Sequence, residues 1–248
     1  LDAAGVSYVA FVDADDYVAP DFILTLYLLC KEHGTQIAQC DFAHVTGDVF
    51  CPKQSERHIN VYSNVEMLSN LYSPLYLQTV TVWSKLYETK LFDAVRFPVG
   101  MTHEDEATTY KLIYAAERIA VTNAKLYAYF YEPGSITRRP YNVHRLDALP
   151  ILRERAEFFA QKGLGQLAKK AWEKYCLSLA GHLYLVKKHI PDSAKIQRRL
   201  RRELKAVLPA VRKDTDLAPY MRFKFWLLQL APLTYARLRH KKDHFSVE

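Results

Sequence analysis

The sequence predicts an α/β protein whose second part consists of helices alone. Short β-rich runs alternate with amphipathic stretches as far as residue 140, which is typical of a sheet with helices packed on it. From residue 141 onwards only helical periodicity remains, and basic residues become frequent. We therefore expect an α/β domain over 1–140 and a helical, basic extension over 141–248.

The elements of the α/β part are predicted from periodicity and from turn residues. They are, in order, a strand at 8–12, a helix at 21–32, a hairpin formed by 37–45 and 47–52 with Gly47 near its turn, a helix after Ser63, a strand at 77–83, a helix from 103 to 119, and a strand and turn over 125–135. Ser63 and Glu66 form an S-x-x-E capping box, the strongest of the start signals. In the basic part, the sequence pattern predicts four helices, near 143–162, 164–189, 192–207 and 217–239, with breaks around Gly163, Pro191 and Pro219.

Composition narrows the class of protein. Half of the 248 residues are hydrophobic and 13% are aromatic, which predicts a packed globular core. No apolar run is long enough for a transmembrane helix, and the basic start of a signal peptide is missing. The four cysteines (Cys30, Cys40, Cys51 and Cys176) form no metal-type pair, so we expect reduced thiols in a cytoplasmic protein. The first residue is Leu rather than Met, which suggests a fragment of a longer chain.

Charge is divided unevenly between the two parts. Residues 1–140 carry 11 Lys and Arg against 17 Asp and Glu, a net charge of −6. Residues 141–248 carry 23 against 10, a net charge of +13. This division indicates two roles within one chain.

An acidic cluster follows the first predicted strand. In "VAFVDADDYVAP", Asp13 and Asp15 lie two residues apart, so in extended backbone they face the same way. Two hard oxygen ligands at a strand end suit Mg²⁺ or Mn²⁺ bridged to a diphosphate. The alternative is that Asp16 or Asp21 caps the next helix and the other acids are solvated. The segment is not an EF-hand loop, because the glycine that such a loop requires is absent. It also matches the DxDx(T/V) motif of dehalogenase-type phosphatases poorly, because Tyr17 stands at the position of the Thr or Val.

A second acidic cluster opens the helix predicted from residue 103. Glu104, Asp105 and Glu106 lie in its first turn, where the helix dipole favours negative charge, so an ordinary helix start explains them too. A carboxylate placed opposite a bound electrophile can also act as a base toward a hydroxyl.

Four segments in this order resemble bacterial family 2 glycosyltransferases with the GT-A fold, including enzymes that build capsular and other surface polysaccharides. They are "YVAFVDADDYVAPDF", "VWSKLYETKLF", "VRFPVGMTHEDEATTY" and "KLYAYFYEPGSIT". The resemblance implies a GT-A-like (Rossmann-like) mixed sheet that is N-terminally truncated, because the family's first strands, which bind the nucleotide, have no counterpart here. The isolated chain is therefore expected to bind nucleotide-sugars poorly.

The resemblance also implies a role for each matching residue. "VDADD" matches the DxD motif, so Asp13 and Asp15 would hold Mn²⁺ or Mg²⁺, and Asp13 and Asp16 would contact the donor. Asp105 of "HEDE" would be the catalytic base. Trp83 and Lys85 of the W-x-K segment would lie beside the acceptor, as would His103 and Glu104, although core packing explains Trp83 equally well.

The implied function is metal-dependent, inverting transfer of a sugar from a nucleotide-diphosphate sugar, with a UDP-sugar expected, to an acceptor hydroxyl. A polysaccharide or lipid-linked saccharide acceptor is expected. The alternatives are a catalytically inactive binding or scaffold module of the same fold and, less well matched, a phosphatase.

The basic part leaves three interpretations open. In "YMRFKFWLLQLAPLTYARLRHKK", aromatic and leucine side chains stand between cations, which fits an anionic membrane surface at the inner face of the cell membrane. The other interpretations are helices packed on the catalytic domain with a solvated basic face, and nucleic-acid binding. No nucleic-acid motif is present, so no nucleic-acid partner is predicted.

Overall fold

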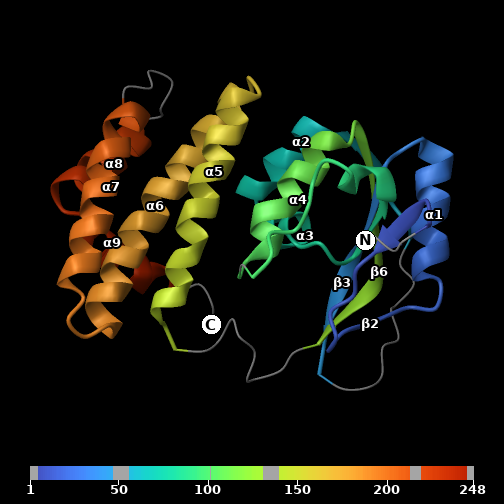
Figure 1. Ribbon diagram of the computed structural model, residues 1–248, viewed down its shortest axis with the longest axis horizontal. Coiled ribbons are helices and arrows are strands. Elements are labelled where there is room, and N and C mark those ends of the chain that lie inside the picture. The colour runs from blue at the N-terminus through green and yellow to red at the C-terminus, as the bar shows by residue number, and fades with distance from the viewer. Residues whose placement is uncertain (1–4, 47–55, 101, 131–139, 213–218, 245–248) are drawn as a thin grey trace. The chain divides into compact units, whose positions relative to one another are not determined.

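The computed structural model describes residues 5–46, 56–100, 102–130, 140–212 and 219–244. The chain divides into two compact units, Leu1–Arg139 and Pro140–Glu248 (Figure 1). None of the helices in these described ranges has an apolar stretch sufficient to cross a bilayer. The described cysteines, Cys30, Cys40 and Cys176, are free and buried, whereas Cys51 lies outside the described residues.

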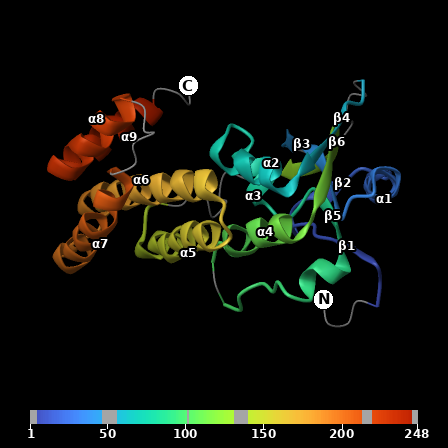
Figure 2. The same cartoon turned by 90° about the horizontal axis from the view of Figure 1, so that it is seen from above.

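The first unit combines one sheet with short helices. Its elements are β1 (Tyr8–Ala10), β2 (Tyr17–Val18), α1 (Phe22–His33), β3 (Ile37–Val45), β4 (Ile59–Ser63), α2 (Asn64–Ser69), η1 (Asn70–Tyr72), α3 (Tyr76–Val80), β5 (Lys85–Glu88), η2 (Thr89–Phe92), α4 (Glu104–Ala115) and β6 (Arg118–Phe130). Helix α1 covers one face of the sheet, and α2, α3 and α4 cover the other (Figures 1 and 2).

The sheet is mixed, as the glycosyltransferase resemblance implies. Its strands run in the order β1-β5-β3-β6-β2, and β4 pairs with β6 beside that path. Only the central pair, β3 and β6, is parallel among the described pairs. At 13 residues, β6 is long enough to pair with β4 near its start, where Ala120 lies opposite Val61, and with β2 near its end, where Ala128 lies opposite Tyr17. The end of β6 is thereby brought to the segment between β1 and β2.

Local signals explain several element boundaries. Helix α1 ends at Gly34, whose φ of 59° is left-handed and whose N–H bonds to the carbonyl of Cys30, a conformation that glycine adopts at little cost. The predicted capping box is confirmed, because the Ser63 hydroxyl accepts from the N–H of Glu66 while the Glu66 carboxylate accepts from the N–H of Ser63.

The prediction of a strand at 77–83 is wrong. Residues 76–80 form helix α3, and β5 begins only at Lys85. Apolar runs this short fit a strand or a buried helix equally well. In the helix, the hydroxyls of Thr79 and Thr81 donate to the carbonyls of Leu75 and Leu77, four residues earlier, at 2.8 and 2.9 Å. A hairpin is predicted over 37–45 and 47–52. The structure confirms its first strand as β3, and residues 47–52 lie outside the described residues.

The second unit is helical throughout its described part. Its elements are η4 (Val143–Asp147), α5 (Ala148–Gln161), α6 (Gly165–His189), α7 (Ala194–Arg212), α8 (Pro219–Leu230) and α9 (Pro232–His244). The long helix α6 packs against α5, α7 and α9, and leucines such as Leu179 and Leu183 fill the core between them. This arrangement confirms a helical extension, with two corrections.

The corrections concern proline. The single helix predicted over 217–239 is two helices, since Pro232 starts a new one and Pro219 opens α8 instead of breaking it. Proline is tolerated in a first helical turn, where its missing N–H has no partner to lose. Helix α7 also continues past residue 207 to Arg212 with Pro209 inside it.

Candidate active site

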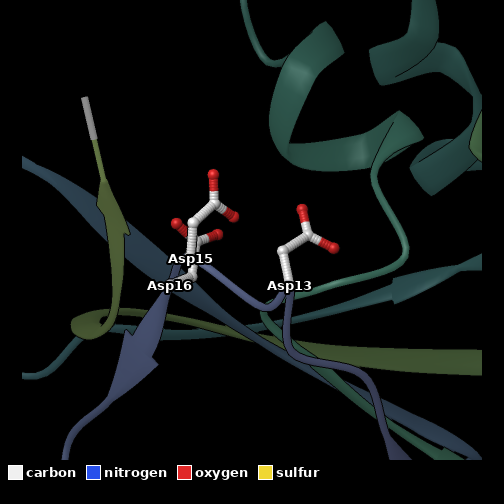
Figure 3. Close-up of side chains that lie close together, drawn as sticks. All are labelled: Asp13, Asp15 and Asp16. Atoms are coloured by element: carbon white, nitrogen blue, oxygen red, sulfur yellow. The ribbon is translucent and has the colours of Figure 1, made fainter. Parts of the chain in front are cut away.

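The acids Asp13, Asp15 and Asp16 lie on a turn between β1 and β2. The N–H of Asp16 donates to the carbonyl of Asp13 at 3.1 Å, so the backbone is not extended there as predicted. Each acid offers one carboxylate oxygen, and these oxygens lie within 4.8 Å of one another. Figure 3 shows the Asp13 and Asp15 carboxylates raised to the same side of the turn. The turn, and not strand alternation, brings the acids together.

Asp16 is tied to β6. Its Oδ2 accepts a 2.6 Å bond from the Tyr127 hydroxyl, and its Oδ1 accepts a 2.7 Å bond from the N–H of Phe130. The same Tyr127 hydroxyl accepts from the N–H of Asp13 at 3.1 Å. Asp16 therefore does not cap helix α1. The N-cap position of α1 belongs to Asp21, which makes no capping bond there.

Asp13 is the acid on which negative charge converges. Partial loss of hydration, followed by the charges of Asp16, Asp15 and Glu104, raises the pKa of Asp13 to about 6. Because Glu104 at the start of α4 contributes to this shift, the two acidic clusters of the sequence are close enough to interact electrostatically.

Asp105 lies in the first turn of α4, half-buried. Burial is the main reason that its pKa is raised to about 6, and the charges of Glu104 and Asp13 add to the effect. A hydrogen bond from the backbone of Val82 and the charge of Lys85 oppose it. The Oδ1 atom of Asp105 is buried and has no hydrogen-bond partner among the described residues. A half-buried carboxylate with a free oxygen and a pKa near neutrality is suited to accept a proton.

Lys85 lies on β5 with no exposed surface. Its Nζ atom donates to the carbonyls of Gln78, Thr81 and Trp83 at 2.6, 2.7 and 3.4 Å. Burial lowers the pKa of Lys85 to about 7, while the charge of Asp105 opposes that shift. Lys85 therefore binds α3 and the residues that follow it, and its enclosed ammonium group does not support the predicted acceptor contact.

Trp83 is also buried, at 3% exposure. Its ring stacks on Tyr127 at 4.7 Å and on Tyr129 at 5.3 Å between ring centroids, and Phe42 meets it edge-on. The packing alternative accounts for all of these contacts, so the acceptor role of Trp83 stays a prediction without support from its position. Through Tyr127, however, Trp83 supports the acidic turn.

His103 and Glu104 are exposed at the start of α4. His103 occupies the N-cap position with a left-handed φ of 66°, which is uncommon for a residue with a side chain. Strained backbone of this kind is concentrated at functional sites. Both residues directly precede Asp105 in the sequence, and their acceptor role stays a prediction.

The donor set at the turn fits a hard divalent cation. Asp13 and Asp15 are exposed and each has oxygens to offer, whereas both oxygens of Asp16 already accept hydrogen bonds. Mg²⁺ and Mn²⁺ are commonly held by one or two carboxylates, with phosphate and water completing the shell. Asp13 and Asp15 are thus the residues that could hold the cation, with Asp16 orienting the turn.

Nothing in the sequence pattern indicates that Tyr127 belongs to the candidate site. It lies in the β-rich run "KLYAYFY", where alternation predicts only a buried or exposed face. Its bond to Asp16 joins residues 111 positions apart, and no local pattern announces such a contact.

Comparison with known proteins identifies glycosyltransferases. No protein-family model matches the chain. The glycosyltransferase GlyA of Streptococcus pneumoniae is 32% identical over 146 residues, which cover 53% of this chain and 20% of GlyA. The uncharacterized glycosyltransferase YibD of Escherichia coli is 30% identical over 146 residues, which cover 56% of this chain and 42% of YibD. The chain thus spans less than half the length of these curated relatives.

The fold has a counterpart among solved structures. S. aureus TarS 1–349, in complex with UDP-GlcNAc, matches 99% of this chain and 70% of the TarS chain, with a TM-score of 0.60 and 17% identity. At that identity the match concerns the fold alone. The predicted GT-A-like fold and the resemblance to bacterial glycosyltransferases are confirmed.

Proposed function

We propose that the protein is a metal-dependent glycosyltransferase that moves a sugar from a UDP-sugar to an acceptor hydroxyl with inversion. The observation that carries this proposal is the meeting of two carboxylate clusters. The cation-type pair Asp13 and Asp15 lies near the start of α4, where Asp105 has a raised pKa and a free buried oxygen. Relatives named as glycosyltransferases support the reaction class, and the UDP-GlcNAc bound to TarS supports a nucleotide-sugar donor.

In this mechanism each acid has one task. Asp13 and Asp15 would hold a divalent cation, Mn²⁺ or Mg²⁺, and such a cation would supply the positive charge that stabilises a leaving diphosphate. Asp105 accepts the proton of the acceptor hydroxyl as its oxygen forms a bond to the anomeric carbon. The bond from that carbon to the diphosphate oxygen breaks on the opposite face, and the bond electrons leave with the diphosphate. A single displacement of this kind inverts the anomeric centre.

The raised pKa of Asp105 serves this role. A base with a pKa of about 6 is ionised at neutral pH, yet binds a proton more readily than an exposed aspartate. The positive charge of Lys85 limits the rise in the pKa of Asp105 and favours the ionised form of the carboxylate. We further propose that the acceptor is a saccharide or lipid-linked saccharide of a surface polysaccharide, used at the cytoplasmic side of the membrane.

The test uses a chain extended upstream of Leu1, assayed for UDP release from a panel of UDP-sugars. Asp105→Asn is expected to lose at least about 100-fold in release while UDP binding is kept, because proton transfer of this type contributes about 10²–10⁴-fold. Glu106→Gln, which removes the neighbouring carboxylate of the same helical turn, is the matched control and should remain active. Comparable release by Asp105→Asn would contradict the base assignment. No release from any donor would favour the inactive-module alternative.

A further inference from the structure

A groove between α7 and α8 combines positive charge with an apolar floor. Its volume is about 890 Å³. The cationic residues that line it all come from α7, and the apolar residues come from both helices and from the start of α9. They are Arg198, Arg201, Arg202 and Lys205, with Leu204, Leu208, Pro209, Leu228, Leu230 and Pro232, besides Gln229.

The four cations of this groove have no anionic partner among the described residues. Nearby cations on the same helix are engaged instead, since Arg199 lies 3.8 Å from the carboxylate of Glu203 and Arg212 donates to the side chain of Gln229. Among the residues that the structure describes, no aspartate or glutamate lines the groove. Four like charges side by side along less than three helical turns repel one another unless an anion is bound.

Helix α8 presents an apolar stripe to solvent next to this groove. Tyr220, Phe223, Trp226 and Leu230 are 71%, 62%, 46% and 63% exposed. They recur at helical spacing, and the rings of Phe223 and Trp226 stack with centroids 5.8 Å apart. Leu230 belongs both to the stripe and to the groove lining, so the apolar and cationic surfaces are continuous.

We propose that this α7–α8 surface, defined by the four groove cations and the four stripe residues, docks on an anionic phospholipid bilayer. Aromatic and leucine side chains partition into the interface between headgroups and acyl chains, and neighbouring cations then meet lipid phosphates. A soluble polyanion would engage the cations but leave the stripe in water. A second copy of the same surface would place the unpaired cations of both copies against each other. The bilayer alone satisfies both features.

The inference concerns the second unit only and is independent of the proposed glycosyl transfer. It is tested with the 248-residue chain by sedimentation with vesicles of phosphatidylcholine alone or of phosphatidylcholine with about 30% phosphatidylglycerol. Binding is expected to the anionic vesicles only and to weaken with salt. Replacing Arg198, Arg201, Arg202 and Lys205 together by Gln should weaken it at least about tenfold.

A matched control removes the same charge elsewhere on this unit. Lys170, Lys187, Lys188 and Lys195 are exposed outside the groove, and their replacement by Gln should leave binding nearly unchanged. Equal loss in the two variants would overturn the proposal, because it would indicate diffuse attraction by net charge. Equal binding to vesicles without phosphatidylglycerol, or binding to none, would overturn it as well.

Tryptophan fluorescence tests the stripe directly. Of the three tryptophans, Trp83 and Trp172 are buried or partly buried, so Trp226 is the exposed reporter. Brominated lipid should quench Trp226 in anionic vesicles, and Trp226→Phe should remove the quenched component. Phe223→Ser, whose side chain lies outside the core, should weaken binding without a change in the circular dichroism spectrum. Binding without quenching would show that only the cations are used, and would overturn the bilayer assignment in favour of a soluble polyanion.

Discussion

The hydroxyl of Tyr127 donates a 2.6 Å hydrogen bond to Oδ2 of Asp16. It also accepts from the N–H of Asp13, so a single oxygen holds both ends of the acidic turn. Because Tyr127 stacks on the buried ring of Trp83, the position of the turn is fixed by the core of the unit. The acids that we propose as cation ligands are therefore preorganised, although they lie on an exposed loop.

Tyr127→Phe should loosen the acidic turn while keeping the ring stack. Hydrogen bonds to charged groups contribute about 1.5–3 kcal/mol, so the free energy of unfolding should fall by about 2 kcal/mol. Affinity for Mn²⁺, measured by calorimetry, should fall by roughly tenfold or less, because Asp13 and Asp15 themselves remain. Tyr8→Phe removes a hydroxyl from β1 and should change Mn²⁺ affinity little. Unchanged Mn²⁺ affinity in Tyr127→Phe would show that the turn is ordered without this bond.

Asp13→Asn should stabilise the metal-free protein near neutral pH. The pKa of Asp13 is raised to about 6, above the value of about 3.9 expected in the unfolded chain. Between these values the folded state holds a proton that the unfolded state has released, so stability falls as pH rises through that window. Because Asp13 is partly exposed, we expect the variant to gain only about 1 kcal/mol at pH 7.5 and nothing near pH 4.

Urea unfolding at the two pH values measures this difference. Added Mn²⁺ should stabilise the wild-type protein at pH 7.5 but stabilise Asp13→Asn much less, since a ligand of the folded state raises stability by mass action. Equal stabilisation of both proteins by Mn²⁺ would exclude Asp13 as a ligand.

Lys85→Met should destabilise the protein strongly. The substitution keeps the length of the side chain but leaves the carbonyls of Gln78, Thr81 and Trp83 without their donor, and a buried polar group without a partner costs about 1–3 kcal/mol. We expect a loss of about 3 kcal/mol in urea unfolding. Loss of the positive charge should also raise the pKa of Asp105, so the acid limb of the pH–activity profile should move to higher pH.

Lys90→Met is the control for this substitution. Lys90 is exposed and pairs with Glu88 at the surface, so stability and the pH profile should both change little. If Lys85→Met lowered stability without shifting the pH profile, Lys85 would have a structural role alone.

Ser63→Ala should remove one side of the capping box at the start of α2. The N–H of Glu66 would lose its acceptor, with an expected cost of about 1 kcal/mol in the free energy of unfolding. Ser63→Thr keeps a hydroxyl at the N-cap and should retain most of the stability. A cost as large in Ser63→Thr as in Ser63→Ala would point to packing at residue 63 instead.

Signals that act over a few residues were predictable from the sequence. The capping box at Ser63, the glycine that ends α1 and the acidic first turn of α4 each depend on neighbours along the chain. The placement of both acidic clusters at one site followed only from the resemblance to glycosyltransferases. No periodicity relates Asp13 to Asp105.

The remaining features depend on tertiary contacts. Residues 77–83 are apolar enough for a strand. In the structure they begin as helix α3, and Lys85 from β5 binds the carbonyls of Gln78 and Thr81, a contact that local sequence does not predict. Trp83 was matched to an acceptor site, but three aromatic rings from distant strands enclose it. The sequence predicts extended backbone at Asp13–Asp16, whereas the structure has a turn there whose two ends are bound by Tyr127 of β6. Such contacts are decided by packing and not by local propensity.

The metal dependence of donor turnover tests the central claim most directly. A chain extended upstream of Leu1 would be assayed for UDP release from the preferred UDP-sugar, with Mn²⁺ or with a chelator, as wild type and as Asp15→Asn. We predict UDP release by the wild type with Mn²⁺ and little release with the chelator. In Asp15→Asn the rate of UDP release should fall at least about 100-fold although the variant is folded as the wild type is. Release that is insensitive to the chelator, or that survives in Asp15→Asn, would contradict a cation site at the Asp13–Asp16 turn.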